Sequence, residues 1–136
     1  MPSKAVSDAF EARLATWVNI ASCPLVDLNE VSDVPKPPYV QIQYPVSKEN
    51  RMSVGTPAVY RETGGARFVI TVPALKSGWK DQVLGWAEEL RDLFRGKAFA
   101  GVETDEASPA VLDDRNRDGN KYHVPFAVAY RFDALK

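Results

Sequence analysis

The residues whose spacing comes closest to a known chemistry are Asp114, Asn116, Asp118 and Gly119, which match the first half of an EF-hand calcium loop. Calcium prefers several oxygen ligands at two-residue spacing, with a glycine at the sharp turn. The twelfth position of such a loop would be Pro125, where a bidentate glutamate is required. We therefore expect a polar hairpin tip here, no bound metal, and no change in melting temperature with calcium.

Two single residues, His123 and Cys23, are the other candidates for chemistry. His123 is the only histidine, with no cysteine near it in sequence, so a surface histidine is favoured over a general base or metal ligand. Cys23 has no histidine at a recognisable family spacing, which argues against a catalytic thiol. Gly64-Gly65 precedes an expected strand, whereas a phosphate loop follows a strand and carries a lysine. The sequence therefore predicts a protein that is not an enzyme and holds no cofactor.

Composition is typical of one soluble globular domain spanning residues 1–136. The chain has 17 basic and 18 acidic residues, and this near balance of charge argues against a general nucleic-acid clamp. One cysteine allows no internal disulfide, so stability should not depend on an oxidising compartment. No stretch approaches the ~20 apolar residues that a membrane span needs. We therefore expect a chain made in the cytosol, with no membrane partner.

The elements around these residues are dominated by one long strand near the C-terminus. Six aromatic or branched residues alternate with small or polar ones, a period of two that predicts a strand with one apolar face. At eleven residues it is about twice the usual strand length of roughly 5–6, which places it at or near the centre of a sheet. The six residues are Tyr122, Val124, Phe126, Val128, Tyr130 and Phe132.

Two amphipathic helices are predicted. The first covers residues 4–18 after Ser3, a plausible N-cap, with Val6, Phe10, Leu14 and Trp17 at helical spacing. The second follows Ser77 and ends at a glycine, Gly96, that can adopt the left-handed conformation. Its apolar stripe is broad and includes both Trp79 and Trp86, which are interpreted as core residues.

Further strands are expected at residues 39–46 and 66–73, with weaker signals at 25–28 and 109–113. Asp118-Gly119 predicts a hairpin tip within residues 115–121. Residues 97–108 are expected to be a polar connection. This order predicts an α+β fold of two layers, in which an antiparallel or mixed sheet of four to five strands carries both main helices on one face.

Residues 47–65 show no clear period and exceed the usual connection of ~4–6 residues. They are interpreted as a functional arm, a flexible loop or an extended hairpin, and an early start of the next strand would fall at Val59 and Tyr60. We expect this segment to serve assembly rather than folding. Arginine, methionine and aromatic residues are favoured at interface centres. The candidate contact residues are Arg51, Met52, Val54 and Tyr60.

The arrangement resembles the tail terminator-like proteins of siphophages and prophages, a phage-related family long described without a function. The resemblance covers nearly the whole chain. It rests on the segments Phe10-Glu11-Ala12-Arg13-Leu14, Pro38-Tyr39-Val40-Gln41, Arg61 to Gly65, Phe68-Val69-Ile70-Thr71-Val72, Trp86-Ala87-Glu88-Glu89-Leu90 to Phe94, Asp118-Gly119, Tyr122, Val124-Pro125-Phe126 and Tyr130.

The resemblance implies a sheet flanked by helices whose protomers form a ring, commonly a hexamer. In that family the ring caps the finished tail tube and joins it to the head, so the implied partners are further copies of this chain, the tail tube protein and a head-completion protein. DNA would pass through without specific binding. The implied location is the host cytoplasm during assembly and then the virion tail, and no catalytic residues carry over.

Two other classes of function remain open from the residues alone. One is a small α+β ligand-binding or regulatory module without catalysis. The other is a small hydrolase whose active site forms only in the folded chain. A solvent-accessible pocket with convergent polar groups would favour either of these, whereas a ring would favour the terminator.

Overall fold

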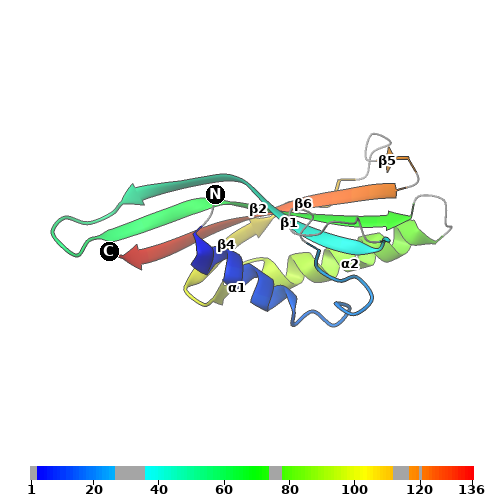
Figure 1. Cartoon of the computed structure of the whole chain (residues 1–136), viewed down its shortest axis with the longest axis horizontal. Helices are drawn as coiled ribbons and strands as arrows, with labels where there is room; N and C mark the ends of the chain where they lie inside the picture. The colour runs from blue at the N-terminus through cyan, green and yellow to red at the C-terminus, as the bar shows by residue number, and fades with distance from the viewer. Residues whose placement is uncertain (1–2, 27–35, 74–77, 112–116, 120) are drawn as a thin grey trace.

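The computed structural model describes residues 3–26, 36–73, 78–111, 117–119 and 121–136. In this part of the chain the sheet has the strand order β1-β2-β6-β4-β3, and the two-residue β5 also pairs with β6. Neighbouring strands are antiparallel throughout. Both helices lie against one face of the sheet (Figure 1). The predicted two-layer α+β fold is thus confirmed, with an antiparallel sheet. Its elements are α1 (Lys4–Leu14), β1 (Tyr39–Arg51), β2 (Val59–Pro73), α2 (Trp79–Phe94), β3 (Ala98–Phe99), β4 (Val102–Ala107), β5 (Arg117–Asp118) and β6 (Lys121–Leu135).

Strand β6 is the predicted long strand, and it lies between β2 and β4. Val124, Phe126, Val128 and Tyr130 are at most 2% exposed, so the predicted apolar face is correct. A proline is usually excluded from a central strand because it lacks an N–H. Here Ala127 N–H bonds to the Ser108 hydroxyl on the β4 side, and by alternation the nitrogen of Pro125 faces that side too. β4 pairs with β6 only from Val128 onwards, so no ladder bond is lost at Pro125.

The core lies between this face and the two helices. Phe10 of α1 stacks on Phe94 of α2 at 5.6 Å between ring centroids and meets Tyr130 edge-on at 5.6 Å. Phe68 of β2 stacks on Phe126 of β6 at 5.0 Å. Aromatic pairs of this geometry add to the free energy gained by burial. The same four elements therefore supply the core that supports the rest of the sheet.

The first helix is shorter than predicted, because it ends at Leu14 and not at residue 18. The Thr16 hydroxyl donates to the Arg13 carbonyl at 2.6 Å, a local bond that competes with helix continuation. Ser3 is at the N-cap position but its side chain makes no cap bond.

At the second helix Ser77 lies outside the described residues, and Gly78 is the N-cap. Gly96 has a φ of +62°, as predicted for the residue that ends this helix.

The segment 97–108 is not a polar connection, because it contains β3 and β4. Val102, Thr104 and Ala107 are buried while Glu103 and Asp105 face solvent. The acidic residues on the solvent side made the segment look like a polar connection in the sequence, so this strand was not predicted. Residues 109–111 form no strand, and 112–113 lie outside the described residues. Of the weak strand at 25–28, Leu25 forms a parallel bridge to Val40, and residues 27–28 lie outside the described part.

The second face of the sheet is not wholly exposed either. Tyr39, Val69 and Thr71 point away from the helices by alternation, yet they are 2%, 6% and 0% exposed. On the helix-facing side Val40, Phe68, Ile70 and Val72 are buried, as the alternation predicts. Val46, which the same alternation places on this face, is 64% exposed, because the register of β1 shifts between Gln43 and Val46. The hairpin tip is confirmed, since Asp118 pairs with Lys121 and Gly119 has a φ of +61°.

Residues 47–65 form an extended hairpin, the third of the three interpretations. β1 continues to Arg51 and β2 starts at Val59, with Lys48 opposite Thr63 and Arg51 opposite Tyr60. β2 also pairs with β6 there, Tyr60 opposite Ala134. The three strands project beyond the helices at the left of Figure 1. We call this projection the arm, which comprises residues 46–65 and residues 129–135 of β6.

Candidate interaction surface

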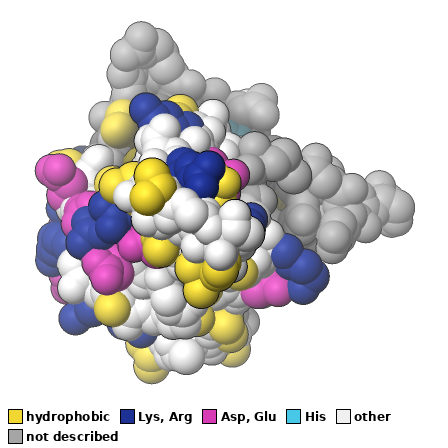
Figure 2. All heavy atoms as spheres, turned by 90° about the vertical axis from the view of Figure 1, so that its left-hand side faces the viewer, with side chains coloured by type: hydrophobic (Ala, Val, Ile, Leu, Met, Phe, Trp, Pro, Cys, Tyr) yellow, Lys and Arg dark blue, Asp and Glu magenta, His cyan; other side chains and the backbone are white. Residues whose placement is uncertain are grey.

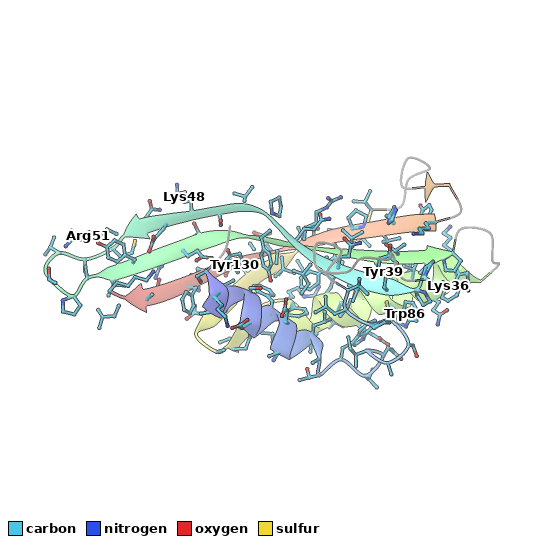
Figure 3. All side chains as sticks on the ribbon, in the orientation of Figure 1. Lys36, Tyr39, Lys48, Arg51, Trp86 and Tyr130 are labelled. Atoms are coloured by element: carbon cyan, nitrogen blue, oxygen red, sulfur yellow. The ribbon has the colours of Figure 1, made fainter. Side chains whose placement is uncertain are left out.

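The end of the arm brings together all four candidate contact residues. Arg51 is the last residue of β1, Met52 and Val54 follow it in the turn, and Tyr60 lies opposite Arg51 in the hairpin register. The Arg51 guanidinium lies 6.0 Å from the centre of the Tyr60 ring, within range of a cation–π contact. Figure 3 shows Arg51 at this end and Tyr130 far behind it, near the helices.

The turn itself is held by bonds from its own residues. Arg51 Nε donates to the Ser53 carbonyl at 2.9 Å, and its Nη2 donates to the Gly55 carbonyl at 2.8 Å. The Val59 N–H donates to the Ser53 hydroxyl at 2.8 Å. These bonds tie the turn to both strands. The apolar side chains at the end of the arm are therefore presented on an ordered support.

Three large apolar side chains are exposed at this end. Met52 is 53% exposed, Val54 is 92% exposed, and Leu135 of β6 is 67% exposed. Figure 2, which looks onto this end, shows hydrophobic side chains interspersed with basic and acidic ones. Apolar side chains exposed among charged ones are typical of contact sites between proteins. Sequence reasoning missed Leu135, because the alternating pattern of the last strand was followed only to residue 132.

Glu62 links the base of the arm to the body, by which we mean the two helices and the part of the sheet that they cover. The Tyr130 hydroxyl donates to Glu62 Oε2 at 2.7 Å, and the Ser3 N–H at the start of α1 donates to Oε1 at 3.1 Å. Burial, and then the Glu62 carboxylate, raises the pKa of Tyr130 above its ordinary value. The phenol therefore stays protonated and continues to donate. One carboxylate thus joins β2, β6 and the first helix at the point where the arm leaves the body.

The backbone is also tightly packed at this base. The register of β1 shifts between Gln43 and Val46, which marks a bulge. A side chain at Gly64 would place its Cβ 2.3 Å from the Val46 carbonyl oxygen. Only a glycine lets the two backbones approach so closely. Gly64 is thus needed for β2 to pass the bulge of β1.

Charged pairs cross the outer face of the arm. Arg61 of β2 makes two hydrogen bonds to Asp133 of β6, at 2.8 and 3.0 Å. The Arg61 guanidinium lowers the pKa of the Asp133 carboxyl. Arg131 of β6 bonds Glu103 at 2.6 Å and Asp105 at 3.0 Å on β4. Exposed pairs contribute little individually, so their main effect is to cover this face with charge and to favour one strand register.

The residues considered for chemistry are dispersed. His123 is half-buried, and its Nδ1 lies 2.8 Å from the Thr71 hydroxyl. Cys23 is fully buried, and this burial raises the pKa of its thiol to about 12, so it stays protonated at neutral pH. Asp114 and Asn116 lie outside the described residues. Within the described ranges no group of three or more His, Cys, Asp or Glu side chains is placed to hold a metal ion. Those ranges also contain no helix long and apolar enough to cross a membrane.

Comparison with known proteins supports the fold alone. No family model matches the chain, and no curated protein matches it. One solved structure, of a protein whose name gives no function, is similar over 100% of this chain and 99% of its own length, with a TM-score of 0.59 and 20% identity. At that identity the likeness extends to the arrangement of helices and strands and not to activity.

Proposed function

We propose that this chain is a structural phage protein of the tail terminator type, which forms a ring that caps the tail tube and joins it to the head. The proposal rests on the resemblance of the sequence segments given above, and on one observation: the three-stranded arm with its exposed apolar end. A ring protomer needs two different surfaces that match each other, because a cyclic contact is heterologous. An ordered projection that presents Met52, Val54 and Leu135 supplies one such surface.

Arg51 and Tyr60 give this surface its specificity. Arginine and tyrosine contribute strongly at interface centres because they combine a large apolar area with a polar group. Their mutual contact fixes both side chains before binding, which lowers the entropy lost on association. The partner is a neighbouring copy in the ring, and the completed ring contacts the tail tube protein and the head-completion protein.

The test compares two substitutions of exposed valines. Val54 is 92% exposed at the end of the arm, and Val18 is 83% exposed beyond α1. A charge at either position should leave the fold intact, because neither side chain is buried. Purified wild-type protein is mixed with tail tubes assembled from the tube protein of the same prophage, and end-capping rings are counted by electron microscopy.

We expect Val54→Asp to lose ring formation and tube capping, while Val18→Asp caps tubes as the wild type does. A tenfold loss of affinity would correspond to about 1.4 kcal/mol, well within the range for one central interface residue. The proposal is wrong if the wild-type protein never caps tubes. The assignment of the contact to the arm is wrong if Val54→Asp caps them normally.

A further inference from the structure

The outer face of the arm, which points away from both helices, has a surplus of positive charge on one side. In the described part of the chain the Lys48 ammonium group of β1 makes no hydrogen bond or ion pair. The Arg67 guanidinium of β2 bonds there only the neutral side chain of Gln43, at 3.1 Å. Both basic side chains are exposed, and Figure 3 shows Lys48 on the side of the arm away from the helices. This side of the face therefore holds two cations without a carboxylate partner among the described residues.

The opposite side of the same face has a surplus of negative charge. Glu103 and Asp105 of β4 both bond Arg131 of β6, so two carboxylates share one guanidinium. Between the two sides, Arg61 of β2 pairs with Asp133 of β6 and adds no net charge. The outer face is thus positive along β1 and β2 and negative along β4.

The strand registers arrange these side chains in rows that cross the sheet. Directly opposed residues share a face, so one row consists of Lys48, Thr63, Arg131 and Glu103, in that order from β1 to β4. In the next row towards the end of the arm, Arg61 lies opposite Asp133. The two ends of each charged row have opposite signs. Such a row is complementary to a reversed copy of itself.

The row on the body side of these charges has small side chains. Gly65 of β2 lies between Val46 of β1 and Ala129 of β6. Ala129 is exposed, and Val46 is 64% exposed, so apolar area is open to solvent here. Small side chains in the middle of a face let a second sheet approach closely. Further along, the same face is already buried at Val69 and Thr71, so the open part of the face belongs to the arm.

We propose that a second copy of this chain packs on this surface, outer face against outer face. The two-fold axis runs parallel to the strands, between β2 and β6. Such an axis keeps each row opposite itself and reverses it, so β1 of each copy lies over β4 of the other. Lys48 of each copy then faces Glu103 of the other, and Arg61 of each copy faces Asp133 of the other. Stacked sheets lie about 10 Å apart with strand directions within about 30°, a gap that these long side chains span.

Charge selects this axis over the other face-to-face arrangement. A two-fold axis across the strands would place β1 over β1 and β4 over β4. Lys48 and Arg67 would then lie near the same cations of the second copy, and the carboxylates of β4 near each other. Opposite potentials favour a contact and like charges oppose it, so the axis along the strands is preferred. Single exposed ion pairs contribute little, but this contact joins several pairs into one network.

This contact is separate from the ring contact. It is isologous, because the same surface of both copies takes part, whereas a ring contact is heterologous. It uses the outer face of the arm and not the apolar side chains at its end. The inference therefore does not depend on the proposed function.

The test measures the mass of the purified protein by analytical ultracentrifugation at low and at high salt. We expect the wild type to dimerise at low salt and to bind roughly tenfold more weakly at high salt, because salt screens exposed charges. Lys48→Glu and Glu103→Lys should each weaken dimerisation roughly tenfold, since each creates like-charge contacts twice in the dimer. Lys80→Glu is the matched control, because Lys80 is exposed on α2, away from this face.

Mixing the two weakened variants gives the sharpest test. In a dimer of one Lys48→Glu chain and one Glu103→Lys chain, both of these contacts again join opposite charges. We expect the equimolar mixture to dimerise about as strongly as the wild type. Each measurement is repeated with Val54→Asp added, which should abolish the ring and keep this dimer, so that failure of one contact is distinguished from failure of the other.

The proposal is overturned if the wild type stays monomeric at low salt in the presence of Val54→Asp. It is also overturned if Lys48→Glu dimerises as Lys80→Glu does. The pairing of β1 with β4 is wrong if the mixture associates no better than either variant alone, and with it the proposed axis.

Discussion

At Gly64 a single added methyl group would disturb the base of the arm. Gly64→Ala should lower stability by about 1–3 kcal/mol, because the Cβ would lie 2.3 Å from a backbone oxygen that cannot rotate away. Gly65→Ala is the control, since no atom lies within 4 Å of the position of its Cβ. Urea unfolding of both variants measures the difference. Equal stability of the two would contradict the close approach of β1 and β2 at the bulge.

Val128 tests the core face of β6. Val128→Asp should unfold or aggregate the protein, because an unpaired buried charge costs several kcal/mol against a total stability of roughly 5–15 kcal/mol. Ala129→Asp places the same side chain one residue along, where the wild-type residue is exposed, and should remain folded. Circular dichroism melts distinguish the two. A cooperative melt of soluble Val128→Asp would show that the assignment of faces is wrong.

Two buried groups predict a loss of stability at alkaline pH. Burial raises the pKa of Cys23 from 9.0 to about 12. It also raises the pKa of Tyr44 from 10.0 to about 12, outweighing the opposite effect of the Ser7 hydroxyl. The folded state keeps these protons at a pH where the unfolded state releases them. Their contribution to stability is thus complete below about pH 9 and is lost as pH rises towards about 12.

The measurement is the free energy of unfolding in urea at about pH 8 and about pH 11. Cys23→Ala should show a smaller fall between these values than the wild type, because the variant has no thiol to ionise. The absolute stability of the variant also changes through lost packing, so the slope with pH is compared and not the level. An unchanged slope would indicate that Cys23 does not contribute.

At the scale of the element, the arm can be shortened at two places with different expected results. Residues 50–61 can be replaced by an Asn-Gly turn, which joins Glu49 to Glu62, its partner in the hairpin. This variant keeps the Glu62 bonds to Tyr130 and Ser3. Because loop closure costs little, we expect a melting temperature close to that of the wild type, but no tube capping.

Replacing residues 48–63 removes Glu62 as well, and the Tyr130 hydroxyl then loses its acceptor. We expect this longer deletion to lower stability by about 1–3 kcal/mol. The sequence predicts that the whole segment 47–65 serves assembly and not folding. The bonds of Glu62 to Tyr130 and Ser3 give the inner part of this segment a structural role, and a role of the outer part in assembly stays a prediction. Equal melting temperatures for the two deletions would show that Glu62 does not fasten the arm.

Elements with one apolar face were predictable from sequence, and elements without one were not. β6 and α2 carry regular apolar patterns, and both were placed correctly. β4 has only Val102, Thr104 and Ala107 turned inward, and acidic residues on its other face concealed the period. Both faces of the arm lie largely beyond the helices, so its strands are specified by pairing with neighbours, which a hydrophobic period does not reveal. The four candidate residues were chosen by type, and only the hairpin register brought them together.

At the scale of the whole molecule, stability should fall from the body towards the end of the arm. β2 runs through both parts, but Phe68, Ile70 and Val72 are buried while residues 59–63 are only half-buried. Regions with few buried apolar contacts open locally at lower cost. Hydrogen exchange should therefore be faster at the amides of residues 59–63 than at those of residues 66–72. Uniform protection along β2 would show that the arm and body unfold as one unit.

The continuity of β2 and β6 from the core to the end of the arm also has a mechanical consequence. In an antiparallel sheet the hydrogen bonds run perpendicular to the strands. A pull along the arm therefore loads the bonds between β2 and β6 in shear, all together, and does not open them one after another. The register from Val59–Leu135 to Pro73–Lys121 spreads such a load over the full length of both strands. We therefore expect the arm to stretch little when its end is pulled and to transmit the tension to the part of the sheet that packs against the helices.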